Sequence, residues 1–325
     1  MSSLAPADLL VDPSLIIDLD LRSPETMRKL KAILPRVSGA CRLFLVDPLA
    51  PAAAANARAL GATAVLPTSA SVIDIHAAIA THFGIEQGDG AIGAAVRQSV
   101  QAGVDAMDGS FQALVEGKAF SMAGMDGASR QIADAIRGVG ANEWLATVKS
   151  YHVGTYQHCM LVTGVASAFG IGSGMARRDV IKLTVAGLLH DIGKAAIPIE
   201  ILDKPGALTD DELKVMRSHP VVGSTYLMEK SGIDSDILTS VRSHHELLDG
   251  KGYPDGLDAP QIDDLTRILT VCDVYAALIE RRSYKPARSP AQAMIVMDAM
   301  ASVGKLETSL VRELGRIMLA PRAAA

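Results

Sequence analysis

The chain has few aromatic side chains and a single tryptophan, Trp144. Proteins that hold single-stranded nucleic acid stack its bases on aromatic rings, so a platform for a long nucleic acid is not expected. The formal net charge of −5 also argues against binding a polymeric anion through a general basic surface. A small anionic substrate remains compatible with this composition, because a local group of cations and metal ions can bind it at any net charge.

Cysteine is also scarce, and long apolar runs are missing. Cys41, Cys159 and Cys272 are far apart and include no CxxC pair, which argues against a disulfide framework and a zinc–thiolate site. The N-terminus carries acids and prolines where a signal peptide needs a basic start and an apolar run. No stretch approaches the roughly 18 apolar residues of a membrane span. We therefore expect a cytoplasmic protein without a membrane partner.

The first part of the chain alternates strand-like and helix-like segments. Residues 14–21 and 42–46 are short runs rich in Leu, Ile and Val, as buried parallel strands are. Residues 24–35 between them begin and end with proline, which favours a short helix. A third short run at 63–67 precedes another helix-like segment and a glycine-rich break. We predict a small α/β domain over residues 1–84.

Residues 85–128 carry an apolar stripe. Apolar side chains recur every three or four residues over 92–114, which predicts one long helix. Two interpretations stay open: the stripe packs within its own domain, or the helix is a connector that forms a homodimer. Residues 129–325 read almost entirely as helices, and Thr209 and Glu212 form a predicted capping box at the start of one. The predicted architecture is an α/β domain, a helical connector and an all-α domain.

Five histidines and two aspartates are distributed over the helical region. Intervals of 25 to 32 residues separate them, and each fits one helix and a connection, so every segment can direct a side chain to a shared centre. Divalent first-row metals accept imidazole and carboxylate ligands. Seven ligands exceed the needs of one ion, whereas two ions about 3.5–4 Å apart could share a carboxylate and activate a bridging hydroxide. The candidate ligands are His158, His190, Asp191, His219, His244, His245 and Asp273.

A structural role for these histidines is the competing interpretation. A single histidine in an apolar helix is more often a hydrogen-bonded core residue than a ligand. The conjunction of His-Asp, His-Pro and His-His-Glu in a histidine-poor chain favours the metal. The remaining histidines, His76, His82 and His152, lie outside this pattern.

The stretch from His158 to Lys285 resembles the HD-GYP branch of the HD superfamily of metal-dependent phosphohydrolases. The matching segments, in order, are HDIGK at 190–194, KPGALT at 204–209, His219-Pro220, HHE at 244–246, DGKGYP at 249–254, and Asp273 followed by Arg282, Tyr284 and Lys285. This resemblance implies an HD-type helical bundle that hydrolyses cyclic di-GMP to linear pGpG, and in some cases onward to GMP.

The resemblance also implies a role for each matching residue. One ion would be bound by His158, His190, Asp191 and Asp273, and a second by His219, His244 and His245, with Asp191 bridging the two ions. Iron or manganese is the expected metal.

The remaining implied roles concern the substrate. Lys194 would lie over the scissile phosphate, where an ammonium group stabilises developing negative charge. Arg282 and Lys285 would hold phosphate oxygens. A loop beside the pocket would be shaped by Gly252, Tyr253 and Pro254.

Three positions depart from the family pattern. Gly154 stands where members with a third metal ion carry a carboxylate, which favours two ions. Leu247 replaces a usual basic residue, and Ala276 replaces a common aspartate. Changes beside the ligands can lower the rate or the metal affinity while leaving the ligands intact.

The N-terminal domain resembles the later part of a response-regulator receiver domain. Residues 20–24 are similar to the stretch after the phospho-accepting aspartate, and residues 59–67 to the final strand. The acidic metal pair and the hydroxyl residue are missing, and Thr68 replaces the lysine. We expect a truncated or degenerate receiver that makes protein contacts.

The leading functional hypothesis is a metal-dependent cyclic di-GMP phosphodiesterase. One alternative is an effector of the same fold that binds cyclic di-GMP or a partner protein with little turnover, which Leu247 and Ala276 leave open. A second is a hydrolase of another cyclic dinucleotide or of a nucleotide monophosphate. The expected partners are cyclic di-GMP, proteins bound through the N-terminal domain and the GYP loop, and a second copy of the chain.

Overall fold

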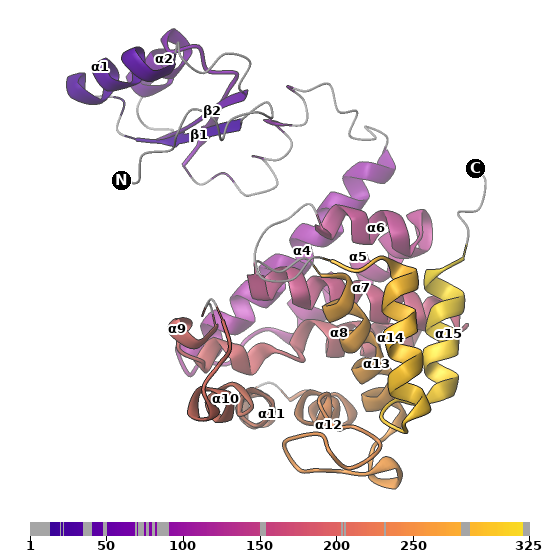
Figure 1. Ribbon diagram of the computed structural model, residues 1–325. Helices are drawn as coiled ribbons and strands as arrows, with labels where there is room; N and C mark the ends of the chain where they lie inside the picture. Colours follow the sequence, from indigo (N-terminus) through magenta and orange to yellow (C-terminus); the bar gives the residue numbers. More distant parts are fainter. Residues whose placement is uncertain are drawn as a thin grey trace. The chain divides into compact units, whose positions relative to one another are not determined.

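The computed structural model of the chain describes residues 14–19, 21, 23–34, 41–47, 51–68, 70, 75, 78–79, 82, 91–149, 154–202, 204, 206–230, 232–280 and 287–320. It divides into two compact units, Met1–Gly93 and Ala94–Ala325 (Figure 1). The boundaries 1–84, 85–128 and 129–325 stay predictions.

The first unit contains a parallel sheet with the strand order β1-β2-β3. Its strands are β1 (Ser14–Asp18), β2 (Cys41–Val46) and β3 (Ala64–Pro67), and its helices are α1 (Pro24–Ile33) and α2 (Pro51–Ala59). Leu30 of α1, Ala57 of α2 and Phe44 of β2 share one apolar core, so these helices pack on the sheet. The predicted α/β architecture is therefore confirmed. Asp20, Arg22 and most of residues 71–83 lie outside the described residues.

The second unit is built from helices. They are α4 (Ala91–Val115), α5 (Met122–Val139), α6 (Ala141–Lys149), α7 (Gly154–Gly172), α8 (Arg177–Leu189), α9 (Ile199–Leu202), α10 (Asp210–Met216), α11 (His219–Lys230), α12 (Ser235–Ser243), α13 (Asp264–Ile279), α14 (Pro290–Ser302) and α15 (Thr308–Met318), with the 3-10 helices η3 (Ile192–Ala196) and η4 (Ala259–Gln261). The predicted all-α fold of this part is therefore confirmed. None of the helices in the described part is both long and apolar enough to span a bilayer.

Helices α7 and α8 form the centre of this unit, and two glycines allow close packing, one between α7 and α8 and one between α7 and α6. A Cβ atom on Gly187 of α8 would lie 2.8 Å from the Thr163 Cα of α7. On the other side of α7, a Cβ atom on Gly164 would lie 2.3 Å from the ring of Trp144. Larger residues at these positions would push the helices apart. This packing sets the separation between His158 on α7 and the end of α8.

The apolar stripe of α4 packs within the same core. Val96, Val100, Met107 and Phe111 are all buried in the cluster that includes α5, α7 and α8. The structure thus shows the first of the two interpretations of this stripe, and the homodimer stays a prediction.

The predicted capping box opens α10. The Glu212 amide donates to the Thr209 hydroxyl at 3.3 Å, and the Thr209 amide donates to the Glu212 carboxylate at 2.7 Å. Lys204 also pairs with Glu212, at 2.5 Å. These contacts tie the connection before α10 to the helix that leads to His219.

Candidate metal centre

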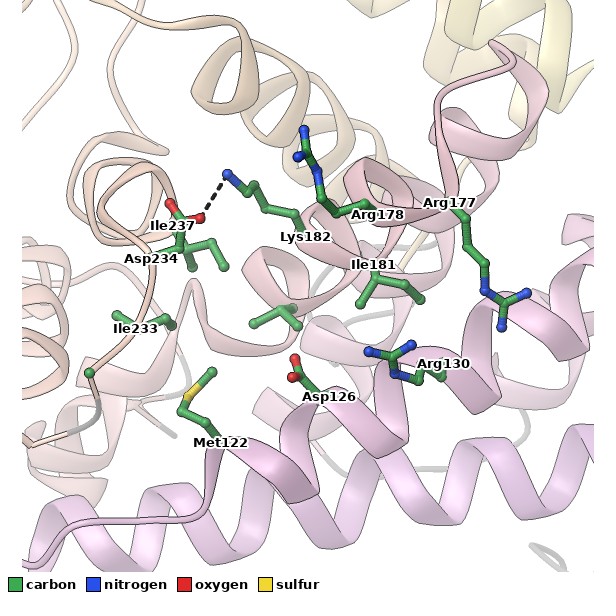
Figure 2. A pocket seen from close by; sticks show the side chains of 12 residues that line it. Met122, Asp126, Arg130, Arg177, Arg178, Ile181, Lys182, Ile233, Asp234 and Ile237 are labelled. Carbon is green, nitrogen blue, oxygen red and sulfur yellow. Dashed lines mark ion pairs between the residues drawn. The ribbon is translucent and has the colours of Figure 1, made fainter.

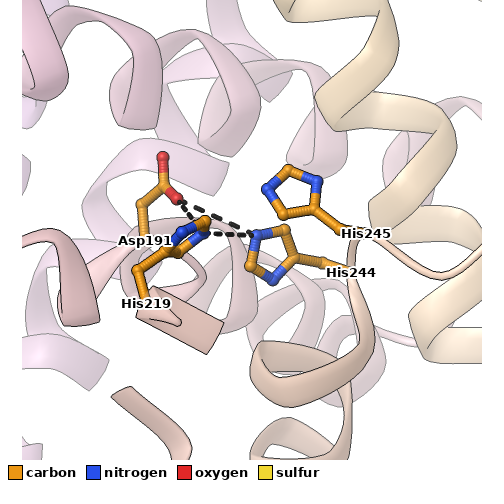
Figure 3. Close-up of side chains that lie close together, drawn as sticks. All are labelled: Asp191, His219, His244 and His245. Atoms are coloured by element: carbon orange, nitrogen blue, oxygen red, sulfur yellow. Dashed lines mark hydrogen bonds and ion pairs between the residues drawn. The ribbon is translucent and has the colours of Figure 1, made fainter. Parts of the chain in front are cut away.

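The candidate ligands converge from five helices. His190 caps the end of α8 and is followed by Asp191, while His244 caps the end of α12. His219 is the first residue of α11. The remaining two elements are the first turns of α7, which carry His158, and the middle of α13, which carries Asp273. Figure 3 shows the convergence for Asp191, His219, His244 and His245.

The ligands form two groups that meet at Asp191. The first group is His158, His190 and Asp273, and the second is Asp191, His219, His244 and His245; the ligand atoms of each group lie within 4.8 Å of one another. In the first group, His158 Nε2 lies 3.0 Å from Asp273 Oδ1. All of these side chains are buried except His245, which is partly buried.

The two carboxylate oxygens of Asp191 face different groups. Asp191 Oδ2 lies 3.3 Å from His190 Nε2 and 3.8 Å from His158 Nε2. Asp191 Oδ1 lies 3.1 Å from His219 Nε2 and 3.8 Å from His244 Nε2. A carboxylate in this arrangement can serve two ions at once.

Backbone carbonyls fix the orientation of three imidazole rings. The Nδ1 atoms of these rings lie 2.7, 2.7 and 2.8 Å from carbonyl oxygens three residues earlier, in the pairs His190–Gly187, His219–Met216 and His244–Val241. A carbonyl only accepts, so each Nδ1 carries a proton and, in the neutral imidazole, each Nε2 presents a lone pair. Metal-binding histidines are oriented by hydrogen bonds of this kind.

The atoms that face the centre are those that a cation would satisfy. His190 Nε2 and Asp191 Oδ1 are buried and have no hydrogen-bond partner. The Nε2 atoms of His219 and His244 lie 3.4 Å apart, with a lone pair on each. Buried unpaired acceptors are costly, and a divalent ion between them would remove that cost. The donor set therefore fits divalent metal ions.

Electrostatics hold three of these ligands, His244, His245 and Asp191, in their metal-binding forms. Burial lowers the pKa of His245 to about 3 and, with the neighbouring imidazoles, lowers that of His244 well below its usual range. Burial alone would raise the pKa of Asp191, but Lys194 and the histidines hold it well below the ordinary value. Neutral imidazoles and ionised carboxylates are the forms that bind metal.

His158 differs from the other imidazoles. Burial would lower its pKa, but contacts with the carboxylates of Asp273 and Glu280 outweigh burial and raise it to about 9. A metal ion at this group would therefore displace a proton from His158.

Lys194 lies at the edge of the centre. Its Nζ donates to Asp191 Oδ2 at 2.6 Å, so it contacts the carboxylate shared by the two groups. Burial would lower the pKa of Lys194, but the charge of Asp191 outweighs this and raises it. Its neighbour Gly193 is sterically required, because a Cβ atom there would lie 1.9 Å from the His219 carbonyl oxygen. This contact seats η3 against α11.

The GYP loop is anchored to the His-His-Glu segment. The Tyr253 amide donates to the His245 carbonyl at 3.2 Å, and the two rings lie 4.7 Å apart. A Cβ atom on Gly252 would lie 2.4 Å from the Glu246 Cα atom, so only glycine fits. The buried Glu246 carboxylate accepts the next three amides, from Asp255, Gly256 and Leu257, at 2.7, 3.0 and 3.0 Å. Pro254 follows Tyr253 through a cis peptide bond.

Two residues at the centre were missed by the sequence reasoning. Glu280 Oε2 lies 3.2 Å from His158 Nδ1, and its spacing of seven residues from Asp273, two helical turns, was a usable signal. Arg217 lies over the Tyr253 ring, with its Cζ 5.1 Å from the ring centroid. No sequence spacing links Arg217 to Tyr253, because the two belong to separate segments.

Other residues discussed in the sequence analysis are not among the ligands that converge here. Arg282, Lys285, His76 and His152 lie outside the described residues. Cys159, in contrast, lies within 4.8 Å of the ligand atoms of His190 and Asp191. Burial raises the pKa of the Cys159 thiol well above its usual range, which favours its neutral form.

A separate cleft of about 480 Å³ lies between α5, α8 and the start of α12, and contains none of the seven candidate ligands (Figure 2). Its cations are Arg130, Arg177, Arg178 and Lys182. Three of them are paired with carboxylates: Arg177 with Asp134, Arg178 with Asp179, and Lys182 with Asp234 and Asp236. The cleft is therefore not a ready anion site.

Comparisons with known proteins agree with this geometry. Residues 142–310 match the family model described as HD domain. A cyclic di-GMP phosphodiesterase of Pseudomonas aeruginosa is 39% identical over 150 residues, which cover 46% of this chain and 36% of that protein. The cyclic di-GMP phosphodiesterase response regulator RpfG of Xanthomonas campestris is 44% identical over 116 residues, 35% of this chain and 30% of that protein.

A further relative has a different named substrate. The 3'3'-cGAMP-specific phosphodiesterase 1 of Vibrio cholerae is 34% identical over 156 residues, 48% of this chain and 36% of that protein. The matched regions thus span about a third of the length of these three relatives.

One solved structure has the same fold. Bd1817, an HDG"Y"P protein from Bdellovibrio bacteriovorus, superposes with a TM-score of 0.53 at 16% identity, over 77% of this chain and 82% of that chain. The family match covers more than half of the chain and includes every candidate ligand. The chain therefore belongs to the HD domain family.

Proposed function

We propose that this chain is an HD-GYP-type phosphodiesterase that hydrolyses cyclic di-GMP to linear pGpG, and in part onward to GMP, with two divalent metal ions. The observation that carries the proposal is the placement of Asp191, whose two oxygens face the two ligand groups. Relatives named as cyclic di-GMP phosphodiesterases support the substrate. Iron or manganese suits this mixture of imidazole and carboxylate ligands.

The residues of the chain divide the catalytic tasks among them. When bound, the two ions would supply Lewis-acid polarisation and an activated water. Asp191 spans the two groups, and the Nδ1–H bonds of three histidines hold their Nε2 atoms in place. The ammonium group of Lys194 lies beside Asp191, where it can stabilise negative charge that develops on a phosphate oxygen.

Positive charge for the rest of the substrate comes from outside the metal centre. A cyclic dinucleotide has two phosphates, and the ions engage the one being cut. Arg217 is exposed and stacks on Tyr253, which in turn lies against His245. We assign Arg217 to the second phosphate or a base of the substrate. Arg282 and Lys285 stay proposed phosphate contacts from the family resemblance.

Two alternatives to cyclic di-GMP hydrolysis also have support, namely another substrate and a binding function with little turnover. The relative specific for 3'3'-cGAMP makes another cyclic dinucleotide the second candidate substrate. Leu247 and Ala276 keep open an effector that binds the dinucleotide with little turnover. For the first unit, its parallel sheet supports a degenerate receiver that makes protein contacts.

Product analysis separates these functions. The protein is purified without oxygen, its metal content is measured, and it is incubated with cyclic di-GMP or with 3'3'-cGAMP before chromatography. We expect about two equivalents of metal, and pGpG formed faster than any product of 3'3'-cGAMP. Tight binding of cyclic di-GMP without product would establish the effector, and a preference for 3'3'-cGAMP would change the substrate.

A further inference from the structure

The position of His158 in its helix distinguishes it from the three histidines held by carbonyls. His190, His219 and His244 each come after the last turn of a helix, where backbone carbonyls have no partner within that helix. Each imidazole uses one of these carbonyls as the acceptor for its Nδ1–H. His158 is the fifth residue of α7, where the preceding carbonyls accept from amides four residues later. Its Nδ1 therefore needs an acceptor from another element.

Glu280 is placed to be that acceptor. It caps the end of α13, is 6% exposed, and brings Oε2 to 3.2 Å from His158 Nδ1. No hydrogen bond to this buried Nδ1 is formed within the described part of the chain, and the Glu280 carboxylate at 3.2 Å is close enough to accept one after a small rotation. Asp273, two turns earlier on the same helix, contacts the opposite nitrogen at 3.0 Å. One helix therefore places a carboxylate against each nitrogen of the ring.

The two carboxylates have different relations to the metal-binding atoms. Asp273 groups with His158 and His190 within 4.8 Å, and Glu280 is not part of that group. Glu280 contacts the nitrogen that faces away from the centre, so it acts on the ligand and not on the ion. A carboxylate in this position orients an imidazole and makes it a stronger ligand.

We propose that Glu280 is a positioning residue that fixes His158 as its Nδ1–H tautomer, so that Nε2 is presented to the metal ion of the first group. This inference rests on the metal-binding part of the proposed function. Ala276, where the family resemblance leads one to expect an aspartate, is fully buried one turn before Glu280 on α13. Glu280 therefore supplies a carboxylate near His158 one turn after the position at which the family has its aspartate.

The test measures metal affinity without any turnover. Manganese(II) is titrated into metal-free wild type, Glu280→Gln and Glu280→Ala against a chromophoric chelator. We expect Glu280→Ala to bind one of the two ions about 10- to 100-fold more weakly, as losses of such outer partners do. Glu280→Gln keeps an oxygen that can accept the proton but loses the charge, so its loss should be smaller. The absorption spectrum of bound cobalt(II) should change for the weakened ion alone.

A matched control separates positioning from general stability. Glu307 is a partly buried carboxylate that pairs with Arg267 of α13 at 2.8 Å and belongs to neither group of candidate ligands. Glu307→Gln should lower the melting temperature and leave both manganese affinities unchanged.

The outcomes distinguish the inference from the proposed function. Wild-type affinity for both ions in Glu280→Gln and Glu280→Ala would overturn the role of Glu280 and leave the phosphodiesterase intact. If Glu280→Ala does not fold, the Glu280→Gln titration decides, because this variant keeps the size of the side chain. A wild-type protein that binds no manganese or cobalt would overturn both the inference and the metal centre. A protein that binds two ions without hydrolysing any cyclic dinucleotide would overturn only the proposed activity.

Discussion

The metal centre and the cleft of Figure 2 both contain charged and polar side chains of the helical unit. The two places differ in whether the polar atoms of these side chains have hydrogen-bond or ion-pair partners. In the cleft, Lys182 contacts Asp234 at 2.9 Å (Figure 2), and it also contacts Asp236 at 2.8 Å. In the centre, His190 Nε2 and Asp191 Oδ1 are buried without a hydrogen-bond partner. Most of the cations that line the cleft are thus already paired with carboxylates.

This difference has an energetic basis. A buried acceptor without a partner costs about 1–3 kcal/mol of folding free energy. Several such acceptors in one place would destabilise the fold unless a bound ligand offsets this cost. Metal binding is such a compensation, because its free energy adds to that of folding. Exposed ion pairs carry no comparable cost. The clustering of two such atoms, His190 Nε2 and Asp191 Oδ1, with further metal-ligand atoms therefore marks the site more clearly than the paired charges of the cleft do.

The largest effect is expected from Asp191→Ala. This change removes the carboxylate that both ligand groups share, so both ions should be lost and hydrolysis should fall to background. Metal analysis of the purified variant is the measurement, with Asp236→Ala of the cleft as the control that keeps both ions. Full metal content in Asp191→Ala would show that this carboxylate does not bridge.

A narrower effect is expected within each ligand group. His219→Ala removes a ligand from the second group only, and His190→Ala removes one from the first group only. Each variant should retain about one equivalent of metal, where Asp191→Ala retains none. Loss of both ions in either single variant would mean that the two groups do not bind independently.

The sequence was sufficient to predict that the seven metal-ligand candidates meet, and the structure was needed to show how they are held and that Glu280 and Arg217 lie beside them. The seven metal-ligand candidates could be found because a His-Asp pair, a His-Pro pair and a His-His-Glu run follow one another at helix-length intervals in a histidine-poor chain, with His158 one interval before them and Asp273 one interval after. The acceptors of the Nδ1 protons could not be found in this way. They are backbone carbonyls, which every residue has, and only the helix ends decide which of them are free.

Other features depended on contacts between distant segments. The stripe of α4 was compatible with a connector or a packed helix, because periodicity shows that a face is apolar and not what covers it. Gly193 was recognised as part of a motif, but its reason is the 1.9 Å approach that a Cβ atom would make to the His219 carbonyl. Glu280 belonged to no motif, and its contact with His158 joins α13 to α7.

A moderate kinetic effect is expected at Arg217. Its guanidinium stacks on Tyr253 beside the centre, and contacts held equally in the ground and transition states act on KM. Arg217→Ala should raise KM for cyclic di-GMP about 10-fold, equivalent to about 1.4 kcal/mol, with little change in kcat. Lys214→Ala is the control, because Lys214 lies on the same helix and is paired with Asp211. An unchanged KM in Arg217→Ala would place this arginine outside the substrate site.

The smallest effect is expected in the cleft, at Lys182. This side chain bridges Asp234 and Asp236 near the start of α12, so its loss leaves two carboxylates close together at the surface. Pairs of this kind contribute about 0.2–1 kcal/mol each, so the loss of two pairs in Lys182→Ala should lower the free energy of unfolding by about 0.4–2 kcal/mol, measured by urea titration. Metal content, KM and kcat should equal those of the wild type. A lower metal content or a raised KM would mean that α12 transmits the change to His244, and the cleft would then be coupled to the centre.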